Sequence, residues 1–230
     1  MDFYNRTLWI LEVFGIEIWI TQTIFNTWMI MLVLILTAII IRVLMSRWKQ
    51  IPQGFQSAVE TIVESFDNMV TSAAGEKFMS LGNWFFTVFV FLLVANLSGI
   101  IGMRPPTADW ATTFAFALAT FFIIQFVGIR HRRGNYLKTF IEPHFLFFPL
   151  NLIGELARPI SLSFRLFGNV LAGMILITLV YAMIPLALRF VLPVALHAYF
   201  DLFSGLLQTY IFCVLSLTFI GSAGTSPDDG

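Results

Sequence analysis

The sequence predicts an all-α integral membrane protein with five membrane segments and one amphipathic surface helix. Of its 230 residues, 58% are hydrophobic and only 11% are charged, and the mean hydropathy is +0.86. A single soluble core could not bury so many apolar side chains. Several uncharged runs approach the roughly 20 residues that cross ~30 Å of hydrocarbon as a helix, and the sequence lacks the alternating pattern of a membrane β-barrel. We expect one membrane domain over residues 1–230.

The first span follows an N-terminal segment that we place at the membrane interface. Residues 1–17 mix apolar and charged side chains and lack the basic start and the cleavage site of a secretory signal. Residues 24–41 are uncharged, and Arg42, Arg47 and Lys49 come directly after them. Because basic residues favour the cytoplasmic side of a membrane, we expect this span to run inward from an external N-terminus.

Residues 52–75 predict an amphipathic helix at the cytoplasmic surface. Pro52 and Gly75 suit its two ends, and apolar residues recur at helical spacing between them. The polar positions are acidic or uncharged: Gln56, Glu60, Glu64 and Asp67. An acidic face is not attracted to anionic lipid, so we expect this helix to pack on protein.

Two further uncharged spans, residues 81–103 and 110–129, are joined by a short turn, and a basic cluster follows the second span. Lys and Arg number four in residues 42–80 and four in 130–144, against one in 104–109 and one in 185–193. This alternation predicts that the N-terminus lies outside and the C-terminus lies in the cytoplasm.

The last two segments, residues 145–184 and 186–220, are each too long for an upright span. A helix of about 40 residues measures ~60 Å, which is roughly twice the thickness of the hydrocarbon layer. Pro149 and Pro159 are natural places for a bend. We expect the two segments to form a hairpin of long, tilted, antiparallel helices.

Polar side chains recur at spacings of three and four along both long segments, which places each set on one helix face. The first set is Asn151, Glu155, Arg158, Arg165 and Asn169, with Leu162 in the same series and Ser161 alongside, and the second set is His197, Asp201, Ser204 and Gln208. Two facing polar stripes can line a hydrated path through lipid. Alternatively, such groups hydrogen-bond to one another and hold the helices together.

Arg165 is the strongest candidate for a functional residue. It is the only charged side chain between Pro159 and Leu188, and an arginine at the bilayer centre costs roughly 2.5–3.5 kcal/mol on insertion scales. Ionisable groups at this depth usually mark ion pathways, and we extend this interpretation to Asp201. For Ser161, Ser204 and Asn169 a structural role is an equal alternative, and His197 suits either a structural histidine or an entry group.

Other classes of site lack their motifs in the sequence. It contains no H-E-x-x-H, no cysteine cluster and no carboxylate pair at ligand spacing, so we expect no metal. It also contains no phosphate loop, nucleophile elbow or dinucleotide fingerprint, so we expect no cofactor and no nucleotide site. The formal net charge of zero gives no reason to expect nucleic acid. The single cysteine, Cys213, lies in an apolar run and suits an inert buried thiol.

The residues around Arg165 closely resemble a known family. The run R-L-F-G-N at 165–169, the Ala-Gly pair at 172–173, Arg158-Pro159 before it and Leu207-Gln208 on the last segment resemble the a subunit of the rotary ATP synthase membrane sector, of the bacterial type. Residues 52–63 resemble the family's amphipathic second helix, and 106–109 resemble its external turn. The resemblance covers nearly the whole chain, from Thr27 to Ile220.

This resemblance implies roles for individual residues. Arg165 would be the essential arginine that faces the rotating c-ring, and Gln208 would be its neighbour on the last helix. Asp201 and Asp109 would belong to an external half-channel. Nine residues after the arginine, where relatives often carry Glu or His, this sequence has Met174, so the external relay would rest on Asp201 alone.

Elementary electrostatics supports the same mechanism. A carboxyl on a lipid-facing rotor is desolvated, which raises its pKa by up to ~3–5 units, whereas a neighbouring fixed cation lowers it by roughly 1–3 units. The rotor carboxyl would therefore release its ion beside Arg165, whose guanidinium cannot practically deprotonate. The same charge would block a direct leak between the external path and a cytoplasmic path near Glu155.

We therefore predict a stator ion-channel subunit of a bacterial plasma-membrane ATP synthase that guides protons or sodium ions through two offset half-channels. The expected partners are the c-ring, the b subunit of the peripheral stalk and the lipid bilayer. The rival prediction is a self-contained secondary transporter, which would show similarly interrupted helices in both halves of the chain. A purely structural scaffold would leave Arg165 unexplained, and an intramembrane protease would need a metal or nucleophile motif.

Overall fold

The computed structural model describes most of the chain, namely residues 7–13, 16–45, 48, 53–132, 136, 138, 140–141, 144–183 and 192–225. Several features of the predicted topology lie outside these residues: Arg47, Lys49, Pro52, Arg133 and the turn at 184–191.

Within the described residues, five helical segments are long and apolar enough to cross a membrane. They are α1 (Gln22–Met45), α3 (Gly82–Leu97) with the flanking 3₁₀ turns η1 (Glu76–Leu81) and η2 (Ser98–Ile101), α4 (Trp110–Arg132), α6 (Phe148–Met183) with the preceding turn η4 (Phe145–Phe147), and the run of α7 (Leu192–His197), η6 (Ala198–Ser204) and α8 (Gly205–Gly224). This arrangement confirms the predicted fold class.

The first span, α1, exposes nearly all of its side chains. Among its residues only Thr23, Asn26 and Ile30 are buried, whereas large apolar side chains from Met29 to Met45 are exposed. An exposed surface of this kind would be insoluble in water and is suited to lipid or to a partner helix in lipid. Asn26 ties the start of α1 to the rest of the bundle, because its Nδ2 donates to the carbonyl of Arg104 at 2.9 Å.

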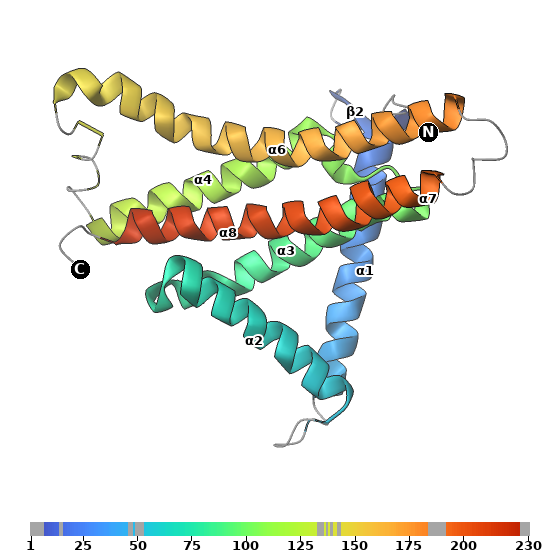
Figure 1. Ribbon diagram of the computed structural model, residues 1–230, viewed down its shortest axis with the longest axis horizontal. Helices are drawn as coiled ribbons and strands as arrows, with labels where there is room; N and C mark the ends of the chain where they lie inside the picture. The colour runs from blue at the N-terminus through green and yellow to red at the C-terminus, as the bar shows by residue number, and fades with distance from the viewer. Residues whose placement is uncertain are drawn as a thin grey trace.

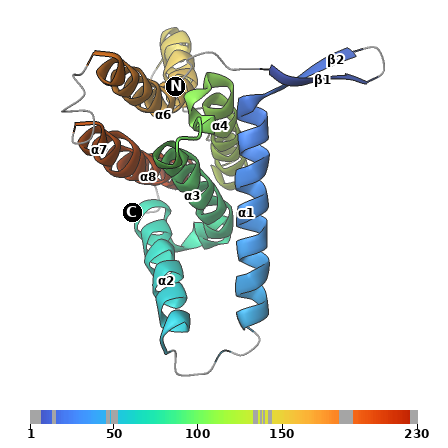
Figure 2. The ribbon, with the colours of Figure 1, turned by 90° about the vertical axis from the view of Figure 1, so that its right-hand side faces the viewer.

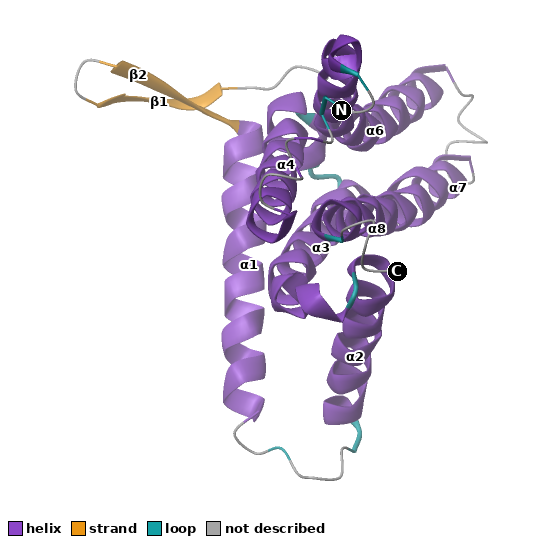
Figure 3. Cartoon of the chain, turned by 90° about the vertical axis from the view of Figure 1, so that its left-hand side faces the viewer, coloured by secondary structure: helices purple, strands orange, loops and turns teal. Residues whose placement is uncertain are grey.

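The chain before α1 forms a two-stranded β-hairpin that the sequence analysis did not predict. Strands β1 (Thr7–Val13) and β2 (Ile16–Thr21) pair antiparallel, with Glu12 opposite Glu17. Figures 2 and 3 show the hairpin extending sideways from the start of α1, away from the other helices. The sequence analysis predicted only that this segment lies at the membrane interface. Trp9 and Trp19 are exposed, and tryptophan is enriched at such interfaces.

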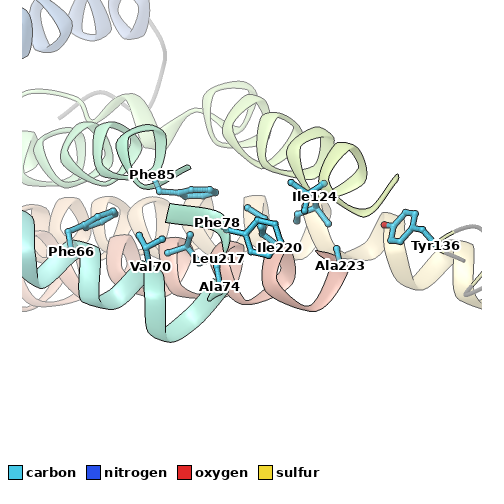
Figure 4. Packing of buried hydrophobic residues seen from close by; sticks show 11 residues of the cluster. Phe66, Val70, Ala74, Phe78, Phe85, Ile124, Tyr136, Leu217, Ile220 and Ala223 are labelled. Atoms are coloured by element: carbon cyan, nitrogen blue, oxygen red, sulfur yellow. The ribbon is translucent and has the colours of Figure 1, made fainter. Parts of the chain in front are cut away.

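Helix α2 (Phe55–Ala74) is the amphipathic helix, and its apolar face forms part of the core. Phe66, Val70 and Ala74 are buried there against side chains of η1, α3, α4 and α8. Figure 4 shows this cluster, in which Phe85 and Leu217 are fully buried. The second half of the predicted apolar face therefore packs on protein, whereas Ile62 and Val63 in the first half are exposed.

The two long segments lie across α1, as expected for strongly tilted helices. Figures 1 and 2 show α1 upright, while α6 and the α7–η6–α8 run cross it side by side. Helix α6 continues through Pro159, which is buried, and α8 extends to Gly224. A second cluster of buried residues, including Leu162 and Leu166 of α6 and Phe212 of α8, holds this pair against α3. The helical hairpin is thus part of the core as well as the place of the predicted polar residues.

Candidate functional site

Arg165 lies at the midpoint of α6 and is exposed at the surface of the chain. Its neighbour Leu166 is fully buried, so this turn of the helix is fixed in the core while the arginine remains accessible. Within the part of the chain that the structure describes, no hydrogen bond or ion pair is made by its guanidinium. A permanent cation without a partner in its own chain can act on a group that another molecule brings to it.

One helical turn after Arg165, the chain makes a polar contact between the two long helices. Asn169 Nδ2 donates to Gln208 Oε1 at 2.8 Å, and Gln208 is 3% exposed. Because residues four apart share a helix face, Arg165 and Asn169 lie on the same side of α6. The Asn169–Gln208 bond therefore fixes the position of α8 beside the arginine.

Four of the predicted residues surround one small cavity next to this contact. Asn169, Asp201, Ser204 and Gln208 line a space of about 10 Å³, together with Asn96 of α3. About 10–15 Å³ is the least volume that holds one water molecule, and such a water needs several polar partners. The polar lining supplies these partners, so the predicted stripe of the second long segment meets the first one here.

Asp201 is held by two neighbours from different elements. His197 Nδ1 lies 2.5 Å from Asp201 Oδ2, one helical turn earlier in the same segment. On the other side, the carboxyl group fits against the backbone of Gly99, where an added Cβ would lie 2.9 Å from Asp201 Cγ. The carboxylate is half-buried, and its position depends on the absence of a side chain at Gly99.

Asp201 also lies within η6, a stretch of π-helix between α7 and α8. A π-helix is wider than an α-helix, is rare, and often occurs at functional sites. The sequence analysis expected a regular helix here. A π-helix has more residues per turn than an α-helix, so residues three or four apart no longer lie directly above one another. The α-helical spacing from His197 to Gln208 therefore does not fully predict which side chains share a face.

Asn96 is a polar residue of this site that the sequence analysis missed. It is 2% exposed in the middle of the bundle, where its Oδ1 accepts from Thr107 Oγ1 at 2.7 Å and its Nδ2 donates to Thr209 Oγ1 at 3.0 Å. The same Nδ2 also donates to the carbonyl of Gly205, at the end of the π-helical stretch. An amide inside an uncharged span was a usable signal, because buried polar groups require partners.

The remaining polar residues of α6 form a separate group near its first turns. Arg158 Nη1 and Glu155 Oε1 are 2.8 Å apart, and Gln125 Nε2 of α4 donates to Glu155 Oε2 at 3.3 Å. Tyr136 donates through its hydroxyl to Gln125 Oε1 at 3.0 Å. A cavity of about 310 Å³ opens beside Glu155, Arg158 and Tyr136. Here Glu155 bonds to α4, against which α6 chiefly packs, whereas the guanidinium of Arg158 lies over Phe219 of α8.

Asp109 lies apart from both groups. Its Oδ1 accepts from the backbone N–H of Ala111 at 3.3 Å, at the start of α4, and it lines a cavity of about 560 Å³ shared with residues of α1. The cavity around Asp201 is lined by other residues. Met174, at the position noted in the sequence analysis, is buried. The structure therefore brings together Asn169, Asp201, Ser204 and Gln208, places Glu155 and Arg158 elsewhere on α6, and leaves Arg165 between the two groups.

Comparison with known proteins agrees with this arrangement. The sequence model of the ATP synthase A chain family matches residues 24–221. ATP synthase subunit a of Moorella thermoacetica is 37% identical over 206 residues, which cover 88% of this chain and 90% of that protein. Subunit a 2 of Bradyrhizobium sp. is 38% identical over 207 residues, covering 89% of both. The subunit of Propionigenium modestum named as sodium ion specific is 34% identical over 225 residues, covering 89% of this chain and 75% of that protein. This chain belongs to the ATP synthase A chain family.

Proposed function

We propose that this chain is the stator subunit that leads ions to and from the c-ring of a bacterial ATP synthase, and that Arg165 is its central residue. A rotor carboxyl would arrive neutral from the lipid and would lose its ion on meeting the guanidinium, because a fixed neighbouring cation lowers the pKa of a carboxyl by roughly 1–3 units. The charge would also repel cations and keep the two half-channels separate.

The observation that carries this proposal is the exposed guanidinium of Arg165 at the midpoint of α6. An arginine that only held helices together would be paired within the bundle, as Arg158 is paired with Glu155. An arginine that serves a moving partner must stay accessible from outside its own chain. The two separate polar groups, around Asp201 and around Glu155, support a pair of offset paths.

In the proposed orientation, the N-terminus lies outside and the C-terminus lies in the cytoplasm. The cavity lined by Asp201, Ser204, Asn169 and Gln208 would then belong to the external path, together with His197 beside Asp201 and with the separate cavity at Asp109. The cavity with Glu155 and Arg158 would belong to the cytoplasmic path. The c-ring would lie against the face that carries Arg165, and the b subunit of the peripheral stalk would hold the chain still.

The transported ion is a proton or a sodium ion. The relative named as sodium ion specific supports the second choice, whereas the His197–Asp201 pair could relay a proton. Each charge that crosses 100 mV releases roughly 2.3 kcal/mol, which becomes torque only while the leak at Arg165 stays closed.

The decisive test replaces Arg165 with alanine in the assembled ATP synthase. We expect Arg165→Ala to abolish ATP-driven ion pumping in inverted membrane vesicles, because no group remains to discharge the rotor carboxyl. The complex should still assemble, since the side chain is exposed and makes no bond in the described part of the chain. Subunit composition of the purified complex checks assembly, and dye quenching or sodium uptake measures pumping.

The matched control is Arg130→Ala on α4, which removes an exposed arginine at the end of a span and outside the polar groups. We expect this variant to pump at the parental rate. Coupled pumping at the parental rate in Arg165→Ala would refute the proposed role of the arginine.

A further inference from the structure

Glu155 is held by a chain of hydrogen bonds that begins on a residue outside the spans. The Tyr136 hydroxyl donates to Gln125, and Gln125 donates to one oxygen of Glu155, while Arg158 pairs with the other. The donors therefore come from both sides of the carboxylate. The sequence analysis assigned no role to Tyr136 or to Gln125.

Tyr136 is tightly packed against α4. It is 5% exposed, and its ring lies against Gly128 of α4, where an added Cβ would come within 2.5 Å of the ring. Phe140 packs edge-on against the same ring at 5.5 Å between centroids. Because Gly128 leaves room for the ring of Tyr136, the ring is held in one place. Its hydroxyl then points toward Gln125.

The hydroxyl of Tyr136 is also a dependable donor. Burial, and next the negative charge of Glu155, raise its pKa above the ordinary value of 10.0, while Arg158, Arg132 and the bond to Gln125 oppose this shift. The tyrosine consequently stays protonated at any physiological pH. Its proton holds Gln125 Oε1, so the amide must present its Nε2 to Glu155.

Arg158 has a fixed position as well. Its guanidinium lies over the ring of Phe219 on α8, 5.0 Å from the centroid, and reaches only one oxygen of Glu155 in the described structure. Without Gln125, both carboxylate oxygens could turn to the guanidinium, because carboxylates favour bidentate pairing with arginine. Such a pair would leave less negative charge facing the adjoining cavity of about 310 Å³.

We propose that Tyr136 is a positioning residue for the cytoplasmic ion path, which keeps the Glu155 carboxylate turned toward the cavity by holding Gln125 in place. This role rests on the proposed function, in which Glu155 receives ions from the cytoplasm. The cavity, lined by Tyr136, Asn151, Glu155 and Arg158 among others, is then the vestibule in which a cation first meets a negative charge.

The test is Tyr136→Phe in the complete ATP synthase, which removes the hydroxyl and keeps the ring against Gly128. ATP-driven pumping in inverted vesicles takes ions from the medium through the cytoplasmic path. The pumping rate of the parent complex is first measured against sodium at fixed pH and against pH at fixed sodium. The ion on which the rate depends is then varied for every variant. We expect the half-saturating concentration of that ion to rise roughly three- to tenfold, as the loss of one hydrogen bond would cause, while the maximal rate stays within about twofold.

Gln125→Leu should give the same shift, and the double variant should be no worse than either single one, because both residues act through one chain. The control is Tyr210→Phe, which removes an exposed hydroxyl on α8 that lines a different cavity. Tyr210→Phe should match the parent in both constants.

Glu155→Gln separates this proposal from the function on which it rests. If Glu155→Gln raises the half-saturating concentration and Tyr136→Phe does not, the positioning role is wrong and the ion path stands. If Glu155→Gln itself leaves pumping unchanged at limiting ion, the cytoplasmic path through Glu155 is wrong. Additive effects of Tyr136→Phe and Gln125→Leu would also overturn the positioning role.

Discussion

Asp201 illustrates how a single ionisable residue can be kept in a membrane helix. Its carboxylate is half-buried and lies 2.5 Å from His197, which can be neutral or charged. A half-buried carboxylate of this kind is less costly when a ring nitrogen of a histidine lies within hydrogen-bond distance, because its charge is then partly compensated. Met174 of α6, which is buried, carries no ionisable group that could act beside Asp201.

We predict that Asp201→Asn slows ion entry from outside by about tenfold at limiting external ion, which corresponds to about 1.4 kcal/mol. The amide keeps the size of the side chain and removes the negative charge that attracts the ion. ATP synthesis driven by an imposed ion gradient in reconstituted vesicles measures this step when the lumenal ion concentration is varied. Asp67→Asn, the same change on α2, serves as the control, and an unchanged rate in Asp201→Asn would remove Asp201 from the path.

Between elements, the position of Asp201 depends on how closely η2 approaches the π-helical stretch η6. An added Cβ at Gly99 would lie 3.0 Å from each oxygen of Asp201, so the carboxylate can lie this close to the backbone of η2 only without a side chain there. Asn96, one turn earlier, bonds to the carbonyl of Gly205 and fixes the other end of the same stretch. The 3₁₀ turn after α3 is therefore part of the site.

We predict that Gly99→Ala reduces ATP synthesis at limiting external ion by roughly threefold, because the methyl group must displace the carboxylate from His197 at a cost of the order of overpacking. Assembly should be retained, and the effect should not add to that of Asp201→Asn. Gly82→Ala at the start of α3 is the control, since its nearest contact would be an ordinary 3.7 Å. A normal rate in Gly99→Ala would show that the close approach has no functional importance.

The sequence predicts the elements well where the signal is local. Uncharged runs of sufficient length specify α1, α3 and α4, and helical spacing of apolar residues specifies α2, because these patterns depend on nearby residues alone. The β-hairpin was missed because its strands are short and their mixture of apolar and charged residues was interpreted as an interfacial segment. The π-helical stretch was missed because the polar residues from His197 to Gln208 keep α-helical spacing in the sequence, which gives no sign of a wider turn.

For the site, sequence-based prediction could single out candidates where a polar residue stands alone in an apolar run. Arg165, Asp201 and Gln208 are such residues, and the structure places Gln208 and Asp201 around one cavity. It failed for Tyr136 and Gln125, because their partnership with Glu155 joins two helices across a loop. Only the fold decides that α6 turns this part of its stripe toward α4.

At the scale of the whole molecule, the charges and the hairpin support the proposed orientation in the membrane. Lys and Arg are concentrated in residues 42–80 and 130–144, and these stretches follow the ends of α1 and α4. The hairpin stands at the opposite end of α1, and its outer strand edges cannot lie in hydrocarbon because their backbone groups would have no partners there. We therefore expect the hairpin to lie in the headgroup layer or in water, which is the external side in the proposed orientation.

We predict that residue 12 faces the outside and residue 64 faces the cytoplasm. Cys213 is the single cysteine and is buried, so a Cys213→Ser background gives a chain without reactive thiols. Glu12→Cys in the hairpin and Glu64→Cys on α2 are matched changes at exposed positions. A membrane-impermeant maleimide should label only Glu12→Cys in right-side-out vesicles and only Glu64→Cys in inverted ones, because basic residues follow α1 on the cytoplasmic side. The reverse pattern would invert the topology and would exchange the proposed external and cytoplasmic paths.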